Sequence, residues 1–265
     1  MIIALLTDFG TKDYFVGAMK GVILSINETA KIVDITHEIP PQEVHSASFT
    51  LRCCYKDFPK KTIFVVLVDP EVGSSRRAIL VETDDYYFVA PDNGLLSFVF
   101  DEETNFRVYE LTNKKFFAEN ISRTFHGRDI FAPVAAHLSN GVRPNEVGME
   151  MKNFVCFQED KPHKVSANET EAQIIYSDRF GNLITNLKKE DLPEKFSLEV
   201  GGKTINKLQN FFAEAEKGEV FMIEGSAGFL EIAVFQGSAE KLLNAENGQK
   251  IIIKELQEDN ALIIN

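Results

Sequence analysis

The chain has 265 residues, 44 % of them hydrophobic, with a formal net charge of −12 and three cysteines. This length accommodates one large or two ordinary domains with a substantial core. The acidic balance argues against nucleic acid as a partner, because phosphate neutralisation needs clustered Lys and Arg. The odd cysteine count gives no disulfide framework and no zinc-ligand spacing.

No membrane partner is expected, because the longest apolar runs are far shorter than the ~20 residues that a membrane-spanning helix needs. Residues 1–6 are apolar, but they lack the basic start of a signal peptide. We therefore expect a cytoplasmic protein.

Strand and helix patterns alternate from the N-terminus to about residue 140. After a first apolar strand at residues 2–6, residues 15–26 carry apolar side chains along one helical face, with Asp13 as the expected N-cap. Further helices are expected at residues 44–55 and after His126. Further strands are expected at residues 31–35, 63–68, 78–82, 86–90 and 106–110.

Residues 63–68 form the most distinctive of these strands. Six consecutive apolar residues, mostly β-branched or aromatic, are typical of a strand buried on both faces of a parallel sheet. Asp69 follows this strand directly, and a short turn leads from it to Arg76. In such sheets ligands bind beyond the carboxyl ends of the strands. Asp69 and Arg76 are therefore candidate site residues.

The pattern changes between residues 147 and 170, which are mostly polar, and a domain boundary is expected there. The N-terminal domain, residues 1–160, is predicted to be α/β with a mostly parallel sheet. The C-terminal domain, residues 161–265, is predicted to be β-rich, either barrel-like or a sandwich. Its expected strands are residues 172–176, 196–200, 220–223, 230–234, 250–254 and 261–264.

Polar side chains follow four of the strands expected in the N-terminal domain. They are Asp8, His37, Asp69 and the pair Asp92–Asn93. Each of them taken singly suits a structural role in a turn. Because the carboxyl ends of parallel strands meet at one edge of a sheet, four such positions together predict a polar site there.

His126 stands between Phe125 and Gly127 just before an expected helix, where a lone histidine is more often structural than catalytic. If it lies within reach of Asp69 and Arg76, the acid could orient the arginine, and the arginine and imidazole could hold and deprotonate a water. The sequence has no G-x-G-x-x-G motif, Walker loop, G-x-S-x-G motif or H-E-x-x-H motif.

Two turns of the C-terminal domain, residues 177–182 and 225–228, are dense in hydrogen-bond donors and acceptors. They could bind a polar small molecule or serve only as hairpin turns. Their composition by itself favours turns.

Eight motifs occur in order along nearly the whole chain, among them Thr-Asp-Phe-Gly at residues 7–10, Asp-Ile-Thr-His at 34–37 and Pro-Asp-Asn-Gly at 91–94. The others lie at residues 16–21, 68–76, 124–133, 178–186 and 226–234. Together they resemble the S-adenosylmethionine hydroxide adenosyltransferase family, which is related to the fluorinases and chlorinases.

The resemblance implies an N-terminal α/β domain, a C-terminal β-barrel-like domain and a homotrimer with active sites between neighbouring subunits. It also implies that water or hydroxide attacks C5′ of the ribose of S-adenosylmethionine and releases adenosine and methionine. The sulfonium leaves as a neutral thioether, so the protein must mainly position the reactants and activate the nucleophile. No metal and no cofactor are expected.

The resemblance also assigns roles to individual residues. Asp69, Arg76 and His126 match the set that activates water in the hydrolytic branch of the family, and Asp8 matches the acid that holds the ribose hydroxyls. His126 favours a hydrolase over a halogenase.

Five residues of the C-terminal domain match positions that contact the substrate. Phe180 and Phe212 match aromatic residues against adenine, and Asn182 matches a residue at a polar edge of the ligand. Asp178 and Ser226 match residues that hold the methionine amine and carboxylate.

One residue departs from the family pattern, since Glu71 replaces a usual glycine between Asp69 and Arg76. If that position requires positive φ, glutamate costs about 1 kcal/mol or more and could displace Arg76.

Three alternatives stay open beside the hydrolase. Within the family, the chain could transfer halide to C5′. Acids and an asparagine at strand ends also suit a divalent-metal nucleotide phosphohydrolase, because carboxylates and water are ligands that Mg²⁺ and Mn²⁺ prefer. A protein that only binds a nucleoside is the non-enzymatic alternative.

Overall fold

The computed structural model describes residues 1–158 and 161–256, and the chain divides into two compact units after Gln158. The predicted domain boundary follows residue 160, and the strand predicted at residues 261–264 lies within residues 257–265; residues 159–160 and 257–265 are outside the described residues. Each unit has its own sheet and its own core.

A seven-stranded sheet with the order β2-β1-β3-β5-β4-β6-β7 forms the centre of the N-terminal unit. The first four strands in this order are parallel, and the other three extend one edge of the sheet in antiparallel pairings. The strands are β1 (Ile2–Thr7), β2 (Lys31–Thr36), β3 (Ile63–Leu67), β4 (Ala78–Thr83), β5 (Tyr87–Pro91), β6 (Phe106–Leu111) and β7 (Gly148–Met151). The predicted α/β class with a mostly parallel sheet is confirmed.

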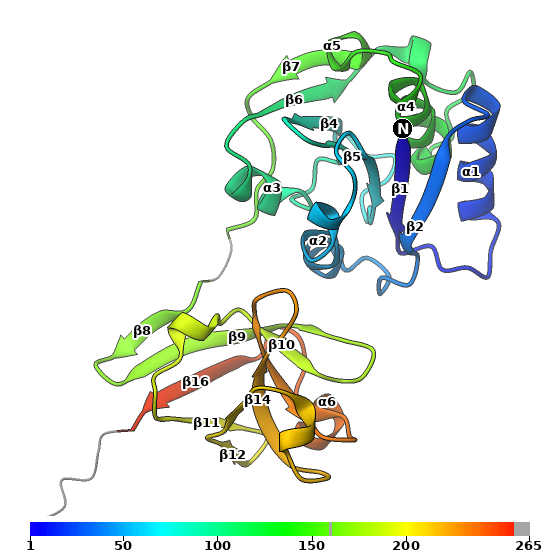
Figure 1. Ribbon diagram of the computed structural model, residues 1–265. Helices are drawn as coiled ribbons and strands as arrows, with labels where there is room; N and C mark the ends of the chain where they lie inside the picture. The colour runs from blue at the N-terminus through cyan, green and yellow to red at the C-terminus, as the bar shows by residue number, and fades with distance from the viewer. Residues whose placement is uncertain (159–160, 257–265) are drawn as a thin grey trace, which may run out of the picture. The chain divides into compact units, whose positions relative to one another are not determined.

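Helices cover both faces of this sheet (Figure 1). Successive strand residues point to opposite faces, so Leu5 packs with the helices α1 and α4 while Leu6 packs with α2 and α3. Every residue of β3 is buried, as the continuous apolar run predicts. The helices are α1 (Phe15–Ile26), α2 (Val44–Arg52), α3 (Ser97–Glu102), α4 (Ala132–Ser139) and α5 (Pro144–Val147), with 3₁₀ turns Tyr55–Asp57 and Lys114–Phe116 and a π-helical turn Gly127–Phe131.

Two local predictions about these helices are wrong. Asp13 does not cap α1, because Tyr14 already has helical backbone angles and occupies the N-cap position without a side-chain cap. The helix predicted at residues 44–55 ends at Arg52, since the backbone leaves the helical region at Cys54 before the 3₁₀ turn.

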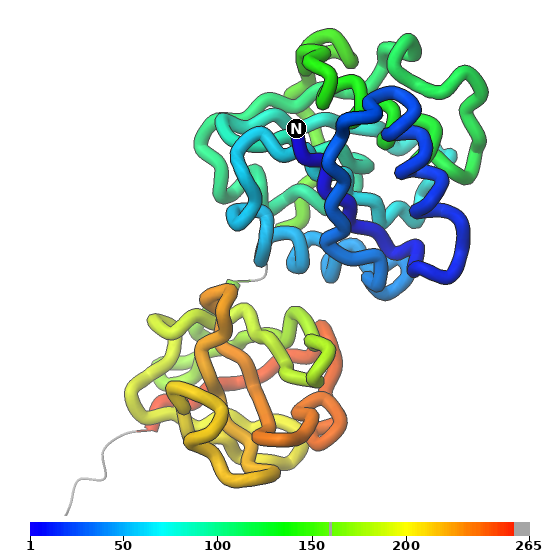
Figure 2. Tube along the Cα trace, turned by 45° about the vertical axis from the view of Figure 1, so that its right-hand side comes forward, coloured from blue at the N-terminus to red at the C-terminus, as the bar shows by residue number. Residues whose placement is uncertain are grey.

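The C-terminal unit is a nine-stranded sheet in the order β12-β11-β16-β9-β10-β15-β14-β13, with β8 paired to β9. Its pairings are antiparallel except for the one between β13 and β14. The sheet curls (Figure 2), β12 approaches β14, and the buried side chains of this unit form a largely aliphatic core. This half-barrel confirms the predicted barrel-like class. Its elements are β8 (His163–Ser166), β9 (Glu169–Ser177), β10 (Leu183–Thr185), β11 (Phe196–Val200), β12 (Lys203–Ile205), β13 (Leu208–Gln209), β14 (Val220–Glu224), β15 (Leu230–Val234), β16 (Lys250–Glu255), α6 (Ala239–Leu243) and 3₁₀ turns Lys189–Asp191 and Phe212–Glu214.

The polar segment at residues 147–170 contains more regular structure than its composition predicts. β7 pairs with β6 and completes the N-terminal sheet, and β8 pairs with β9 in the C-terminal sheet. Each of these strands pairs with only one neighbour among the described strands, and both are largely exposed. Their sequences therefore lack the alternation of apolar and polar residues by which a half-buried strand is predicted. None of the helices among residues 1–158 and 161–256 is long and apolar enough to cross a membrane.

Candidate active site

The parallel strands of the N-terminal unit end where the sequence predicts a site. Asp8 follows β1, His37 follows β2, Asp69 follows β3, and Asp92 and Asn93 follow β5. Because β2, β1, β3 and β5 are adjacent and parallel, these residues all lie at one edge of the sheet.

Two of these strand-end residues, His37 and Asp92, make hydrogen bonds and ion pairs that serve the fold. His37 is buried, with Nδ1 2.9 Å from the Thr7 hydroxyl and Nε2 3.1 Å from a carboxylate oxygen of Asp34. The Asp92 carboxylate, 2 % exposed, accepts two bonds from Arg77 and one from the backbone N–H of Val155. For these two residues the structural alternative holds.

Asp69 and Arg76 form the tightest charged pair at this edge. The Nε of Arg76 lies 2.9 Å from both carboxylate oxygens of Asp69, and its Nη2 donates to Oδ2. The side chains are only 4 % and 10 % exposed, and the guanidinium lies over the ring of Phe131, 5.2 Å from its centroid. A charge-assisted contact of this kind, largely shielded from water, holds both groups in one geometry.

His126 joins this pair across 50 residues of sequence. Its Nδ1 lies 3.1 Å from Nη2 of Arg76. The three side chains that the sequence proposes as a set therefore lie within hydrogen-bonding contact, in the order Asp69, Arg76, His126. We call this set the triad.

Local packing explains how His126 reaches β3. Gly127, which follows it, lies so close to the sheet that an added Cβ would be 3.1 Å from Leu67 and 3.3 Å from Met19. Gly127 also begins the π-helical turn that leads into α4, a rare conformation that is frequent at functional sites. A larger residue here would require the side chains of Leu67 and Met19 to shift by a few tenths of an ångström.

Burial lowers the pKa of His126 below its ordinary value, and the positive charge of Arg76 lowers it further, while the carboxylates of Asp69 and Asp129 act in the opposite direction. Burial is the largest of these causes. The imidazole is therefore neutral near pH 7.

The turn between Asp69 and Arg76 does not carry the strain considered for Glu71. Glu71 is exposed and its φ is not positive, whereas Gly73 has a φ of +83° and would place a Cβ against the carbonyl oxygen of Arg123. The position that requires glycine in this turn still has it. The displacement of Arg76 considered above therefore does not occur, and its pairing with Asp69 is intact.

Asp8 lies at the same edge of the sheet, partly exposed. One of its carboxylate oxygens, Oδ2, accepts a hydrogen bond from the backbone N–H of Gln42, at 2.9 Å. Since a carboxylate has about four acceptor positions, Asp8 keeps capacity for a pair of ligand hydroxyls.

In the C-terminal unit, Asp178 organises the turn between β9 and β10. Its Oδ1 accepts from the backbone N–H groups of Phe180 and Asn182, and its Oδ2 accepts from the side-chain amide of Asn182. Gly181 completes the turn with a φ of +81°. Asp178 and Asn182 thus contact each other, and the predicted turn is present.

Phe180, at the tip of this turn, is 76 % exposed. Phe212 is 41 % exposed and packs edge-on against the buried ring of Phe221. Ser226 is exposed in the tight turn between β14 and β15. An aromatic ring that is mostly in water at a structured turn is available to stack on a ligand.

Three residues around these groups were not predicted from the sequence. Phe131 supports Arg76, and Asp129 is buried, with its carboxylate held by the backbone N–H of Ser122 and by Arg128. Glu231 on β15 shares a sheet face with Ile184 and lies against Gly225, where an added Cβ would be 1.9 Å from its Oε1. Burial raises the pKa of Glu231, and the negative charge of Asp178 adds to this effect. A single charge within the apolar segment 229–235 was the available signal for Glu231.

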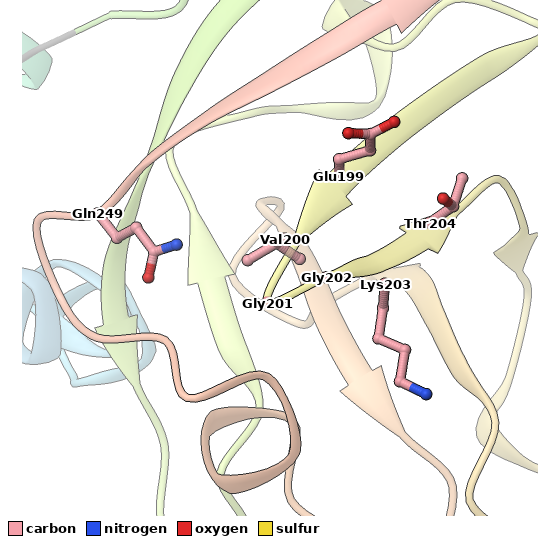
Figure 3. Close-up of a pocket in the computed structure, with 7 residues that line it drawn as sticks. All are labelled: Glu199, Val200, Gly201, Gly202, Lys203, Thr204 and Gln249. Carbon is pink, nitrogen blue, oxygen red and sulfur yellow. The ribbon is translucent and has the colours of Figure 1, made fainter.

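The C-terminal unit also has a hollow at its surface. This hollow, beside the hairpin of β11 and β12, is lined by Glu199, the Gly201–Gly202 turn, Lys203 and Gln249, together with Val200 and Thr204 (Figure 3). It contains none of the candidate residues. Within residues 1–158 and 161–256, no group of three or more His, Cys, Asp or Glu side chains is arranged to hold a metal ion.

The N-terminal α/β unit has an Asp–Arg–His cluster at the carboxyl edge of its sheet. The C-terminal unit is a curled β-sheet with an exposed aromatic turn. These features define a two-domain protein with a candidate site for a small polar ligand. The model of the SAM hydroxide adenosyltransferase N-terminal domain matches residues 3–148, and that of the C-terminal domain matches residues 172–252. The chain belongs to the SAM hydroxide adenosyltransferase family.

Named relatives cover nearly the whole chain. The (R)-S-adenosyl-L-methionine hydrolase of Methanocaldococcus jannaschii is 37 % identical, with 92 % of each chain covered, and that of Thermus thermophilus is 32 % identical, with 93 % of this chain and 96 % of the relative covered. A fluorinase of Nocardia brasiliensis is 27 % identical over 96 % of both chains.

The fold is also found in a crystal structure. An uncharacterized conserved protein from Thermotoga maritima superposes with a TM-score of 0.88 at 40 % identity, and the match covers 96 % of this chain and 100 % of that chain.

Proposed function

We propose that the protein hydrolyses S-adenosylmethionine to adenosine and methionine, by attack of water or hydroxide on C5′ of the ribose. The observation that carries this proposal is the triad, which is assembled from β3, the following loop and the start of the π-helical turn. Relatives with 32–37 % identity that are named (R)-S-adenosyl-L-methionine hydrolase support the choice of substrate.

In this proposal the triad positions and activates the nucleophile. Asp69 orients Arg76, and Arg76 contacts His126, so the three groups form one preorganised polar surface. Preorganised charges act strongly in a site shielded from water and need no rearrangement during reaction. Because the leaving methionine is a neutral thioether, no acid has to protonate it.

The other candidate residues would bind the substrate. Asp8 would hold the ribose hydroxyls through its free acceptor positions, and Phe180 and Phe212 would stack on adenine. Asn182 would contact a polar edge of the ligand. The exposure of both rings and the fixed geometry of the turn support these roles.

Asp178 and Ser226 would hold the amine and carboxylate of the methionine part. Asp178 carries a negative charge that suits an ammonium group, and Ser226 is an exposed hydroxyl in a tight turn. We further propose a homotrimer in which the triad of one subunit and the turn of Asp178 in the next subunit form one site, working in the cytoplasm without metal or cofactor.

Chromatography of a reaction mixture tests the activity. The purified chain is incubated with S-adenosylmethionine, with EDTA present and halide absent, beside the His126→Ala variant and a His163→Ala control at an exposed histidine. We expect equimolar adenosine and methionine from the parent and the control and about 100-fold less from His126→Ala, the size of a lost catalytic proton or positioning group.

Other outcomes point to the alternatives. Product only with chloride or fluoride, as a 5′-halogenated nucleoside, would make the chain a halogenase. Activity on phosphorylated nucleosides that EDTA abolishes would indicate a metal-dependent phosphohydrolase. Retention of adenosine with no turnover under any of these conditions would leave a nucleoside-binding protein.

Mixing two impaired variants, under conditions in which neither shows activity by itself, tests the shared site. If sites combine two subunits, His126→Ala chains and Asp178→Ala chains refolded together should regain part of the activity, because some sites then contain both native residues. No recovery in mixtures shown to be trimeric would contradict the shared site but not the reaction.

A further inference from the structure

The contact between Arg76 and His126 determines which ring nitrogen of the histidine carries the proton. A guanidinium group has only N–H donors and no acceptor, and it stays protonated in proteins. Nδ1 of His126, 3.1 Å from Nη2 of Arg76, must therefore be the acceptor. In the neutral imidazole the hydrogen then resides on Nε2.

Arg76 cannot easily turn away from this role. Its Nε and Nη2 are bound to Asp69, its side chain is 4 % exposed, and it lies over the ring of Phe131. Among the described residues, no hydrogen bond joins Asp129 to His126, and the Asp129 carboxylate accepts from the backbone N–H of Ser122 and from Arg128.

The opposite nitrogen of the ring is free to meet a ligand. Within residues 1–158 and 161–256, Nε2 of His126 has no hydrogen-bond partner, and it is not sealed from solvent. Asp69 also keeps acceptor capacity, since its Oδ1 receives one bond from Arg76 and a carboxylate oxygen has two acceptor positions.

We infer that Arg76 holds His126 as the Nε2–H tautomer, so that the imidazole donates a hydrogen bond to the reacting water and Asp69 accepts the water's proton. This inference rests on the proposed hydrolysis. It reverses the expectation from sequence that the imidazole deprotonates the water.

The assigned roles balance the reaction. Water forms the O–C5′ bond while the C5′–S bond breaks, and the electron pair of that bond goes to sulfur, which leaves as the neutral thioether of methionine. The surplus proton of the attacking water passes to Asp69 and then to solvent. His126 keeps the hydrogen on Nε2 throughout. It donates this hydrogen to a lone pair of the water oxygen and so holds the water in place.

Two substitutions of His126 distinguish a hydrogen-bond donor from a base that takes the proton of the water. In His126→Gln the side-chain amide can donate from near the place of Nε2 but cannot take a proton, whereas His126→Ala can do neither. We expect the glutamine variant to keep at least about tenfold more activity than the alanine variant, while removal of a true base costs on the order of 10²–10⁴-fold in both. His163→Gln is the matched control at an exposed histidine.

Substitution at Asp69 tests the acceptor. Asp69→Asn keeps the size of the side chain but cannot take a proton, so we expect a larger loss of turnover than in His126→Gln. Equal activity of His126→Gln and His126→Ala, or a smaller loss in Asp69→Asn than in His126→Gln, would overturn the assignment.

Nuclear magnetic resonance gives a reading that needs no activity and no variant. In the ¹⁵N-histidine-labelled parent protein, long-range ¹H–¹⁵N correlations should show Nε2 protonated and Nδ1 unprotonated at pH 7.5. A parent that hydrolyses S-adenosylmethionine with an Nδ1–H tautomer would refute the inference and leave the proposed function standing. A parent with the Nε2–H tautomer and no hydrolysis would instead refute the proposed function.

Discussion

The polar groups of the triad are held by buried contacts between distant segments, whereas those of the turn at residues 178–182 are held by local contacts near the surface. The triad joins side chains separated by up to 57 positions, and its Arg76 and Asp69 are almost completely shielded from water. The turn is local, because the side chain of Asp178 accepts hydrogen bonds from Phe180 and Asn182, at most four residues away, and its aromatic tip, Phe180, is 76 % exposed.

The difference matches the roles proposed for the two regions. Groups that act on a bond must keep one geometry before the substrate arrives, so long-range packing holds them. A turn that stacks on a ligand needs only its own backbone bonds, and its exposed ring gains burial when the ligand binds. Substitutions should therefore affect turnover in the first region and affinity in the second.

The largest effect should come from Arg76→Lys, which keeps the charge but loses the planar contacts to Asp69 and His126. We expect turnover of S-adenosylmethionine to fall about 100-fold, the scale of a small misplacement of catalytic groups. Arg77→Lys is the matched control, since Arg77 binds Asp92 in the same manner. Equal losses of activity in both variants would show that the triad has no special role.

The pH dependence of turnover should reveal the shielding of the triad. Because burial and Arg76 lower the pKa of His126, protonation begins only below its ordinary value of 6.5. Protonation places a hydrogen on Nδ1 of His126 and breaks its contact with Arg76, so we expect kcat/KM to be constant above pH 7 and to fall about tenfold per unit well below the shifted pKa. The neutral form is favoured in the folded state, so this group contributes stability above pH 6.5 that is lost as the pH falls. An activity midpoint above pH 6.5 would contradict this.

Phe180→Ala should change affinity and leave folding intact. Stacking of an aromatic side chain on a base contributes about 1–3 kcal/mol, so we expect KM to rise about tenfold or more with kcat nearly unchanged. Since the ring is mostly in water, the free energy of unfolding should change by less than about 0.5 kcal/mol. Phe211→Ala, at a ring 57 % exposed, is the control. A fall in kcat with unchanged KM would place Phe180 with the triad instead.

The smallest effect should come from Glu231→Gln, beside the turn. The raised pKa of Glu231 means that its charged form is disfavoured in the folded state, so stability falls as the pH rises through its titration. We expect the neutral glutamine to raise the melting temperature at pH 7.5 by on the order of 2 °C, and the gain to vanish near pH 4. A lower melting temperature at pH 7.5 would mean that the charge is stabilising.

The alternation of strands and helices was predictable because apolar residues are spaced differently along a buried strand and along an amphipathic helix. β3 and α1 lie where their patterns predict, within a residue at each end. β10 and β13 were not predictable, since three and two residues carry no period. The cap of α1 was misjudged because Asp13 precedes a residue whose backbone is already helical.

The candidate site also contains residues that were predictable from sequence and residues that were not. Asp8 and Asp69 were accessible from sequence, because both follow buried strands. His37 and Asp92 stand at equivalent positions, yet contacts with Thr7 and Arg77 make them structural. No local pattern separates these two cases, since the partner decides the role.

The sequence by itself determined the order of elements, the α/β and β-rich halves and, through its motifs, the family, because these depend on neighbouring residues and their periods. Only the tertiary structure decided that Arg76 reaches both Asp69 and His126, that Gly127 packs closely against Leu67 and Met19, and that Glu71 is unstrained. Those facts depend on contacts between distant segments, which form only when β3 and the turn before α4 pack together.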